Sequence, residues 1–285
     1  MAASLAASPL GALARRRVAA PRRRVAVARR GVASVRADAT ATKKVVVLGG
    51  SGFVGSRVVD RLASAGVAEV TSISKSGAAV PGASSSVAID LAAAAASEAL
   101  AAAFEGADAV VSCVGCIGGS DEDMRAGNGD ANATAIDAAK TAGVPKFVYV
   151  SVASIVPDVV GATPLMRGYF EGKAAAEAAL MSAYPDASSR LVVKPSFIYG
   201  GDAFSVNPPR VTKQYGDQLV KLLGSGLVKS IAEKAPGAIA LTLAEPVSVD
   251  DVAAAACAGA LGRATTSECD GTDAIKACAG KLDVA

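Results

Sequence analysis

A tyrosine and a lysine four residues apart, Tyr169 and Lys173, are the side chains of this sequence best suited to moving a proton. At this spacing they share one face of a helix. A nearby ammonium stabilises tyrosinate and lowers the pKa of the phenol from about 10 toward working pH, so that the phenol can give or take a proton. Of the five tyrosines, only Tyr169 has a lysine at the fourth place. The competing interpretation is a pair of neighbours on a solvated helix.

Ser151 precedes this pair by one strand-and-helix step. It directly follows residues 146–150, a run rich in aromatic and β-branched residues that is typical of a buried strand. The order of strand, serine, loop, tyrosine and lysine is the order that hydride chemistry would need. We therefore expect Tyr169 to donate a proton, Lys173 to support it and hold a ribose hydroxyl, and Ser151 to polarise a substrate.

A glycine-rich turn indicates where a phosphate would bind. Residues 45–48 read as a buried strand, and Gly49, Gly52 and Gly55 follow with the spacing GxxGxxG before a helical pattern begins. Glycine lets the backbone approach a pyrophosphate, and the N–H groups of the helix that follows point at the anion. The motif favours a dinucleotide. A glycine-rich turn of another α/β protein is the alternative, whereas a Walker-type loop is excluded because no Lys-Ser/Thr pair follows Gly55.

Strands and helices alternate along the chain with short connections, which predicts an α/β fold with a doubly wound parallel sheet of the Rossmann type. We expect strands near 44–48, 70–74, 87–89, 109–113, 146–150 and 190–194, and helices near 53–65, 92–103, 128–142 and 169–182. Residues 38–262 would form the dinucleotide-binding domain. An insertion at about 200–248 would form a small C-terminal lobe on the substrate side. We expect helical stretches near 216–231, within this insertion, and near 248–261, after it. Residues 263–285 read as a polar tail or a frayed helix.

The basic residues are concentrated at the start of the chain. Residues 1–37 contain nine arginines and no acid, whereas the remainder carries 20 basic and 26 acidic residues, a net charge of −6. An Ala/Ser/Arg-rich leader without acids is typical of an organellar transit peptide. The sequence around Val35-Arg36-Ala37 favours a chloroplast, with the mitochondrion as the alternative; a retained basic arm is a further one. Because the acidic remainder offers no basic surface, no nucleic-acid partner is expected.

The five cysteines are an odd number without a framework spacing, so a disulfide scaffold is not expected. Cys113 and Cys116 have CxxC spacing, but the chain has no histidine and no second cysteine pair to complete a zinc site. We interpret the pair as small hydrophobic residues at a cofactor pocket and expect no metal. No apolar run is long enough to span a bilayer, which leaves association with a membrane surface open.

The motifs together resemble the short-chain dehydrogenase/reductase superfamily, in its atypical, extended-like branch. The resemblance covers residues 43 to about 261. It is carried by GGSGFVGS at 49–56, SISKSG at 72–77, AIDL at 88–91, GADAVVSCVG at 106–115, KFVYVSVAS at 146–154, YFEGK at 169–173, KPSFIYG at 194–200 and PVSVDDVA at 246–253. More narrowly, YFEGKAAAE and KPSFIYG are similar to a plant and algal plastid group related to a fungal protein of coenzyme Q metabolism and to an accessory subunit of respiratory complex I.

The resemblance implies a set of cofactor-binding residues. Lys75 stands where an acidic residue would bind the adenosine ribose of NAD, so the family pattern favours NADP, with NAD as the alternative. Asn128 or Asn132 would secure the helix behind the site. Val152 stands nearest to the family's active serine or threonine, with Ser151 and Ser154 on either side. The cofactor-binding residues implied are Gly49, Ser51, Gly52, Phe53, Val54, Gly55, Lys75, Asp90, Leu91, Val114, Gly115, Lys173, Pro195 and Ser196.

Two functions of different classes follow from this interpretation. One is an NAD(P)H-dependent organellar oxidoreductase that acts on a carbonyl or on a quinone-like or isoprenoid-like small molecule, with the cofactor supplying hydride. The other is a non-catalytic dinucleotide-binding protein that assists assembly or regulation in quinone metabolism or in a respiratory or photosynthetic complex. Turnover of a substrate would separate them.

Overall fold

Seven strands form one parallel sheet in a computed structural model that describes residues 43–67, 69–160, 166–201, 205–206, 209–210, 212–225 and 244–282. The strand order is β11-β6-β5-β4-β1-β2-β3. The strands are β1 (Lys44–Leu48), β2 (Glu69–Ser74), β3 (Ser85–Ala88), β4 (Ala109–Ser112), β5 (Phe147–Val150), β6 (Arg190–Lys194) and β11 (Glu268–Asp270). The doubly wound parallel sheet expected from the sequence is confirmed.

The order reverses between β1 and β4, and this reversal determines where a ligand can bind. Val45 of β1 pairs with Val70 of β2 on one side and with Ala109 of β4 on the other. Connections from β1 and β4 leave in opposite directions, which opens a crevice at the carboxyl ends of these strands. The glycine turn that begins at Gly49 lies at this crevice.

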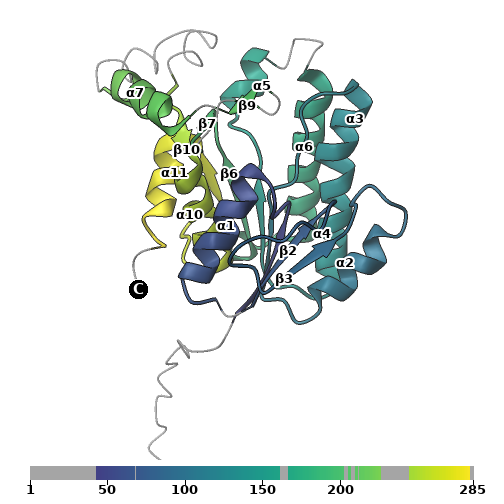
Figure 1. The fold of residues 1–285 in the computed structure, drawn as a ribbon. Helices are drawn as coiled ribbons and strands as arrows, with labels where there is room; N and C mark the ends of the chain where they lie inside the picture. The colour runs from purple at the N-terminus through teal and green to yellow at the C-terminus, as the bar shows by residue number, and fades with distance from the viewer. Residues whose placement is uncertain are drawn as a thin grey trace, which may run out of the picture. The chain divides into compact units, whose positions relative to one another are not determined.

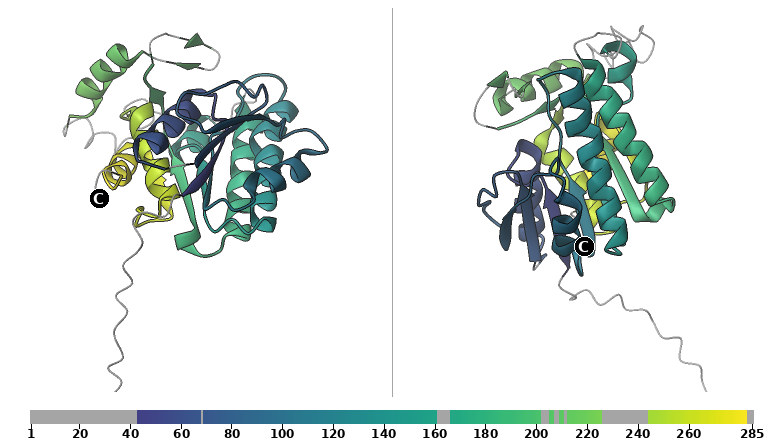
Figure 2. Two further views of the ribbon diagram at one scale, coloured as in Figure 1. Left: turned by 60° about the horizontal axis from the view of Figure 1, so that its bottom comes forward. Right: turned by 90° about the vertical axis from the view of Figure 1, so that its right-hand side faces the viewer.

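Helices cover both faces of the sheet (Figures 1 and 2). One face packs against α1 (Phe53–Ser64), α10 (Val249–Ala260) and α11 (Gly271–Ala279), and the other against α2 (Ala96–Phe104), α4 (Ala131–Thr141) and α6 (Arg167–Ala183). Side chains of a strand point alternately to the two faces. Val45 and Val47 therefore lie in the α1/α10 core, whereas Val46 and Leu48 lie in the α2/α4/α6 core.

The helix expected at 128–142 corresponds to α4, which begins at Ala131. It is preceded by α3 (Asp121–Arg125) and by η1 (Ala126–Asp130), a short π-helical segment. Ser120 and Asp123 form a capping box that starts α3. The π-helical segment brings the Gly129 backbone against Gly172 of α6, where a Cβ on Gly129 would lie 3.0 Å from the Gly172 Cα. The sequence pattern did not indicate α3 and η1, because Gly127 and Gly129 are poor helix formers.

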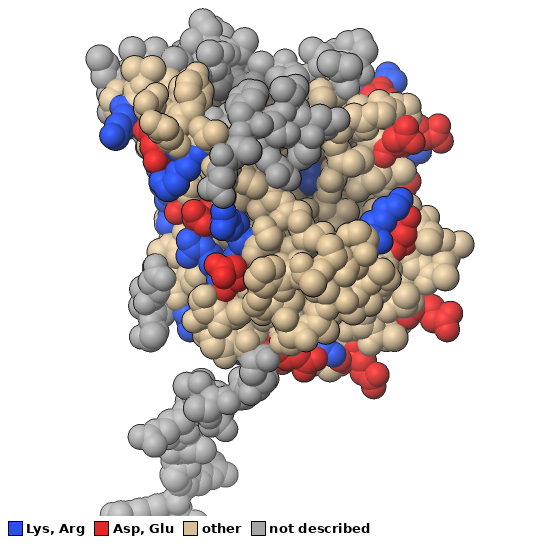
Figure 3. All heavy atoms as spheres, viewed as in Figure 1, with Lys and Arg blue, Asp and Glu red and all other residues tan. Residues whose placement is uncertain are grey.

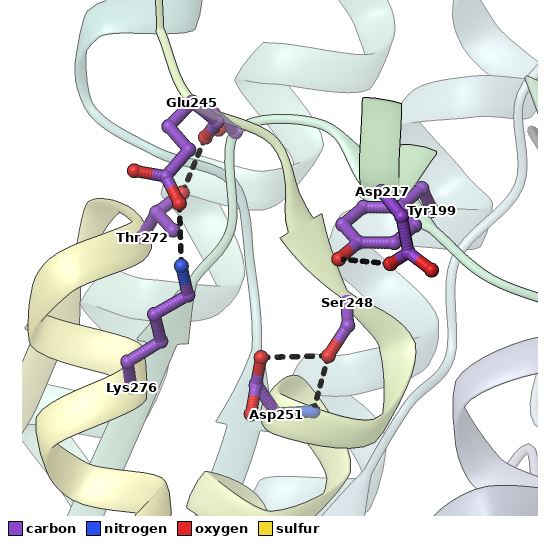
Figure 4. A network of polar contacts seen from close by, with 8 residues as sticks. Tyr199, Asp217, Glu245, Ser248, Asp251, Thr272 and Lys276 are labelled. Atoms are coloured by element: carbon purple, nitrogen blue, oxygen red, sulfur yellow. Dashed lines mark hydrogen bonds and ion pairs between the residues drawn. The ribbon is translucent and has the colours of Figure 1, made fainter. Parts of the chain in front are cut away.

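A smaller lobe lies at the carboxyl end of the sheet. It includes α5 (Ile155–Val160), β7 (Ile198–Tyr199), β8 (Ser205–Val206), β9 (Pro209–Arg210), α7 (Lys213–Leu223) and β10 (Val247–Ser248); a short 3₁₀ helix, η3 (Ala187–Ser189), lies before β6. The expected stretch 216–231 corresponds in part to α7, and its residues 226–231 lie outside the described part of the chain. Tyr199 donates a hydrogen bond to Asp217 at 3.2 Å, which ties α7 to β7 (Figure 4).

Residues 268–279 are not the tail or frayed helix that we expected from their polarity. β11 pairs with β6 and forms an edge of the sheet, and α11 packs against α10. Within residues 41–285 the described part of the chain forms one compact unit, without a boundary at 262. Cys269 and Ile275 are fully buried. The prediction was wrong because β11 is three residues long with acids at both ends, a pattern too short to read as a strand.

Polar contacts join α11 to the segment before β10 (Figure 4). Thr272 donates a hydrogen bond to the backbone oxygen of Glu245, and the Lys276 ammonium pairs with the Glu245 carboxylate. Ser248 caps α10 through the amide of Asp251 at 3.0 Å. The contacts of Thr272 and Lys276 connect α11 to the segment that leads into β10 of the smaller lobe.

The surface mixes both signs of charge. On the face drawn in Figure 3, Lys and Arg side chains lie beside Asp and Glu side chains, with uncharged surface between these groups. Within the described part of the chain, no helix combines the length and apolar character needed to span a bilayer.

The packing of α11 predicts a measurable contribution to stability. Ile275→Ala removes a fully buried side chain and should lower the free energy of unfolding by about 2–5 kcal/mol. Leu222→Ala, at a side chain that is 66% exposed, is the matched control and should change it little. Urea unfolding followed by circular dichroism measures both. Equal, small effects of the two substitutions would mean that α11 does not belong to the core.

Candidate functional site

The glycine turn after β1 has no room for side chains. Gly49 has a positive φ of 72°, which favours glycine. A Cβ on Gly55 would lie 2.1 Å from the Gly49 backbone oxygen, and one on Gly52 would lie 3.0 Å from it. The three spaced glycines therefore allow α1 to begin directly against the end of β1.

The N-terminus of α1 is suited to an anion. Its cap residue is Gly52, which offers no side-chain hydrogen bond, and the first turn, fully described by the structure, contains no acid. The positive end of the helix dipole is therefore not neutralised locally by a carboxylate. This arrangement is the one that binds a phosphate group at a helix N-terminus.

A cavity of about 420 Å³ opens beside this helix end, between the ends of β1, β2 and β4. Eight of the expected cofactor residues line it, namely Gly49, Ser51, Gly52, Lys75, Asp90, Leu91, Val114 and Gly115. Phe53, Val54 and Gly55 form the first turn of α1 next to it. Cys113 and Cys116 also line the cavity, in keeping with their interpretation as pocket residues.

Lys75 and Asp90 face each other at the rim of the cavity. Their ammonium and carboxylate lie 2.8 Å apart, and the Lys75 side chain is 82% exposed. The hydrogen bond between them raises the pKa of Lys75 and lowers that of Asp90. Next to this pair, the buried hydroxyl of Ser74 is one of three buried side-chain atoms in the described part of the chain that have no hydrogen-bond partner. The rim thus offers a cation and a spare hydroxyl to a ligand.

Two asparagines hold the loop that follows β4. Asn132 receives a hydrogen bond from Ser112 at 2.6 Å and donates to the Val114 oxygen at 3.3 Å. Asn128 donates to the Cys116 oxygen at 2.8 Å. Both asparagines are fully buried. They fix the backbone of one wall of the cavity from the helix behind it.

Lys173 is buried between the ends of β4 and β5. Its ammonium donates to the Val150 oxygen at 3.0 Å and reaches the Val114 oxygen at 3.5 Å. Gly115 leaves space for it, since a Cβ there would lie 3.2 Å from the ammonium nitrogen. Burial lowers the pKa of Lys173 to about 8. The lysine therefore exchanges its proton near physiological pH.

Tyr169 lies on the same helix face as Lys173, but its pKa is not lowered as we expected. The ammonium is 5.8 Å from the centre of the Tyr169 ring and is bonded to backbone oxygens of the strand ends. Burial of the phenol raises its pKa to about 12, and Cys116 acts in the same direction. In this structure the tyrosine is a neutral proton donor.

Ser151 is also placed differently from the role we assigned to it. Its hydroxyl donates a hydrogen bond to Glu177 of α6, and its backbone N–H donates to the Val193 oxygen at 2.8 Å. A hydroxyl has one proton to donate. With that proton given to Glu177, Ser151 can only accept a hydrogen bond from another group, so it does not polarise a carbonyl in this arrangement.

Pro195 and Ser196 follow β6 and do not line the 420 Å³ cavity among its described lining residues. Ser196 instead lines a second cavity of about 360 Å³ at the smaller lobe. The other described residues of its lining are apolar: Val156, Phe197, Leu219, Leu223, Ala244 and Pro246.

Sequence reasoning missed four residues that line the first cavity, namely Ile89, Ala92, Gly127 and Ala131. Ile89 and Ala92 flank the expected Asp90 and Leu91, so the end of β3 pointed to them. Gly127 and Ala131 lie in the π-helical region and at the start of α4, where no motif marked them. Glu177 was also missed, although it follows Lys173 by one helical turn.

The chain matches the sequence profile of the NAD(P)H-binding family over residues 49–201, more than half its length. It is 40% identical over 220 residues to an uncharacterized chloroplastic protein of Arabidopsis thaliana, covering 75% of this chain and 70% of the relative. A Rossmann-type parallel sheet with a glycine turn at its crevice defines the class of the protein. The chain belongs to the NAD(P)H-binding family.

Solved structures show the same fold at low sequence identity. WbmH of Bordetella bronchiseptica, solved with NAD+, has a TM-score of 0.53 and 19% identity, with 79% of this chain and 74% of that chain covered. MoeE5, solved with UDP-glucose and NAD, has a TM-score of 0.52 and 18% identity, with 85% and 82% covered. At such identities the likeness concerns the fold.

The residues present fit a dinucleotide. The glycine turn forms a cradle that a Cβ at Gly49, Gly52 or Gly55 would fill. The N-terminus of α1 is suited to a pyrophosphate, and the buried Ser74 hydroxyl has no hydrogen-bond partner within the described part of the chain. Lys75 and Asp90 at the rim would contact the adenosine part of the ligand. Val114 and Gly115 form another part of the cavity wall.

The glycine turn can be tested by filling it. Gly55→Ala places a methyl group 2.1 Å from the Gly49 oxygen, so α1 must move, and the affinity for NADPH and NADH should fall by about tenfold or more. Gly280→Ala, at a glycine with φ −61° and ordinary contacts of 3.7 Å, is the control. Nucleotide fluorescence titration measures the dissociation constants. Unchanged binding in Gly55→Ala would remove the turn from the site.

Proposed function

We propose that the protein is an organellar NAD(P)H-dependent oxidoreductase of the short-chain dehydrogenase/reductase type, which reduces or forms a carbonyl or quinone-like group. The observation that carries the proposal is that the Lys173 ammonium, 5.8 Å from the centre of the Tyr169 ring, reaches the backbone oxygen of Val114 at 3.5 Å. Val114 lines the glycine-rich cavity at the carboxyl ends of β1, β2 and β4. The YFEGKAAAE and KPSFIYG motifs support placement in the plastid group identified by resemblance.

The residues of the chain have separate tasks in this mechanism. NAD(P)H, when bound, supplies the hydride. Tyr169, neutral because burial raises its pKa to about 12, gives its proton to the substrate oxygen. The Lys173 ammonium lies 5.8 Å from the centre of the Tyr169 ring; it would offset the charge of the tyrosinate that forms during turnover, although it does not lower the pKa of the resting phenol, and it would hold a ribose hydroxyl. Ser151, the third catalytic candidate, does not donate to the substrate, because its hydroxyl proton is hydrogen-bonded to Glu177.

The lining of the second cavity supports an apolar substrate. Its described residues include Phe197, Leu219 and Leu223 and no charged side chain. Burial of apolar surface contributes about 25 cal/mol per Å² to binding of a hydrocarbon group. A quinone-like or isoprenoid-like molecule suits this chemistry better than a sugar or a carboxylic acid does.

The Ser74–Lys75 pair supports NADP as the preferred cofactor. Lys75→Ala removes the exposed cation that would bind the 2′-phosphate, so NADPH affinity should fall by about tenfold while NADH affinity stays near its original value. Lys281→Ala, at another exposed lysine, is the control. Fluorescence titration of both nucleotides decides the matter: tighter binding of NADH than NADPH by the unaltered protein would contradict the assignment.

The acid–base role of Tyr169 predicts a loss of turnover. Tyr169→Phe should lower the rate of NADPH oxidation with a soluble quinone such as menadione by about 10²-fold or more, because the proton donor is removed. Tyr215→Phe, at a side chain that is 55% exposed, should retain the rate. Turnover by Tyr169→Phe at the original rate would remove this mechanism.

The same reaction should depend on pH through Lys173. Its pKa of about 8 means that the ammonium is present below this pH and is lost as the pH rises through it. Since the ammonium stabilises the tyrosinate, turnover should decline above about pH 8. A rate that is flat from pH 7 to pH 9 would contradict this role.

The engaged proton of Ser151 and the raised pKa of Tyr169 favour a second candidate, a dinucleotide-binding assembly or regulatory protein without catalysis. Purification with tightly held NADPH that no quinone oxidises would support it. Steady turnover with a quinone would exclude it.

We also propose the chloroplast as the location. The chloroplastic relative and the arginine-rich, acid-free residues 1–37 support this. Import of the full-length chain into isolated chloroplasts, compared with mitochondria, tests it.

A further inference from the structure

Side chains from two successive turns of α6 form hydrogen bonds with Val150 and Ser151, at the end of β5. The Lys173 ammonium binds the Val150 oxygen at 3.0 Å, and the Glu177 carboxylate accepts the hydrogen bond of the Ser151 hydroxyl. Lys173 and Glu177 are four residues apart and therefore share a helix face. Glu177 is the last residue of the YFEGKAAAE motif, but it is not among the expected catalytic or cofactor-binding residues.

Glu177 is itself held from the sheet. Lys194, at the end of β6, lies 3.0 Å from its second oxygen and 3.3 Å from Glu268 of β11. The side chains of Lys194 and Glu177 are only 10% and 17% exposed. Burying a charge pair brings little net stability, so its presence beside a reaction centre calls for another reason.

We propose that Glu177 is a positioning residue of the reaction centre, which orients the Ser151 hydroxyl and keeps a negative charge beside Lys173. The inference rests on the proposed function, because it concerns the same lysine. Lys194 and the C-terminal strand β11 hold the carboxylate in place.

The groups that face Lys173 point to Glu177 as the source of this charge. They are the thiols of Cys113 and Cys116, the rings of Tyr149 and Tyr169, and the Glu177 carboxylate. Burial raises the pKa of Cys113 to about 12 and also raises that of Cys116. Both tyrosines have a raised pKa as well. Near neutral pH these four groups are uncharged, so Glu177 is the anion of the set.

The contact with Glu177 also determines the orientation of the Ser151 hydroxyl. As long as Glu177 is a carboxylate, it takes the only proton of this hydroxyl, whose lone pairs then face other groups as acceptors. Ser151 would thereby receive a hydrogen bond, from the neighbouring Tyr149 hydroxyl or from a substrate, rather than give one.

The charge can be removed with little change of shape. In Glu177→Gln the pKa of Lys173 should fall below its value of about 8, since desolvation then acts without the opposing carboxylate. Glu171→Gln, on an exposed part of the same helix and 3.9 Å from Arg167, should leave it unchanged. The readout is NMR titration of ¹³Cε-labelled lysine in the full chain, with Lys173→Arg for assignment. An unchanged Lys173 pKa in Glu177→Gln would overturn the inference.

A second variant separates the charge from the fold. Glu177→Asp keeps the charge on a shorter side chain, so it should retain most of the Lys173 pKa while weakening the Ser151 contact. Equal shifts in the Gln and Asp variants would show that local packing, not charge, was disturbed and would contradict the proposal. The NMR titration needs no substrate. If the unaltered protein turns over no quinone, the proposed function fails while the titration still decides the role of Glu177.

Discussion

The approach of the α1 backbone to the glycine turn is the contact on which the rest of the structure depends. Gly55 lies so close to the Gly49 oxygen that a single methyl group would separate strand and helix. Only with this contact does the helix begin at the carboxyl end of β1, at the crevice where the strand order reverses. The 420 Å³ cavity, its rim at Lys75 and its wall at Gly115 are all placed relative to that helix end.

A second constraint is the burial of charge at the neighbouring strand ends. Lys173, on α6, and Lys194, at the end of β6, are both buried, and each has an oxygen partner. Glu177, also on α6, pairs with Lys194. The structure thus places two cations and one carboxylate near the ends of β5 and β6, an arrangement that costs desolvation and that specific hydrogen bonds offset.

Much of the fold could be predicted from the sequence, because long buried strands such as β1 and glycines such as Gly49 leave local patterns. Six of the seven strands, and the helices α1, α2, α4 and α6 that cover them, followed from alternation. β11 could not be predicted, since three residues with acids at both ends have no strand pattern of their own and pair only because β6 is there. In the site, the spacing of Tyr169 and Lys173 was readable, but the direction of the Tyr169 pKa depends on burial, and the partner of Ser151 depends on how α6 lies over β5.

The glycine turn meets its ligand with backbone and empty space, so it is suited to the part that all such dinucleotides share. On the proposed assignment, discrimination between dinucleotides falls to rim side chains such as Lys75, which is 82% exposed. Cofactor choice would then be uncoupled from folding. A substitution at this exposed rim could then change the preferred dinucleotide without affecting the stability of the sheet. Evolution could match the protein to the reductant of its compartment while the fold stays the same.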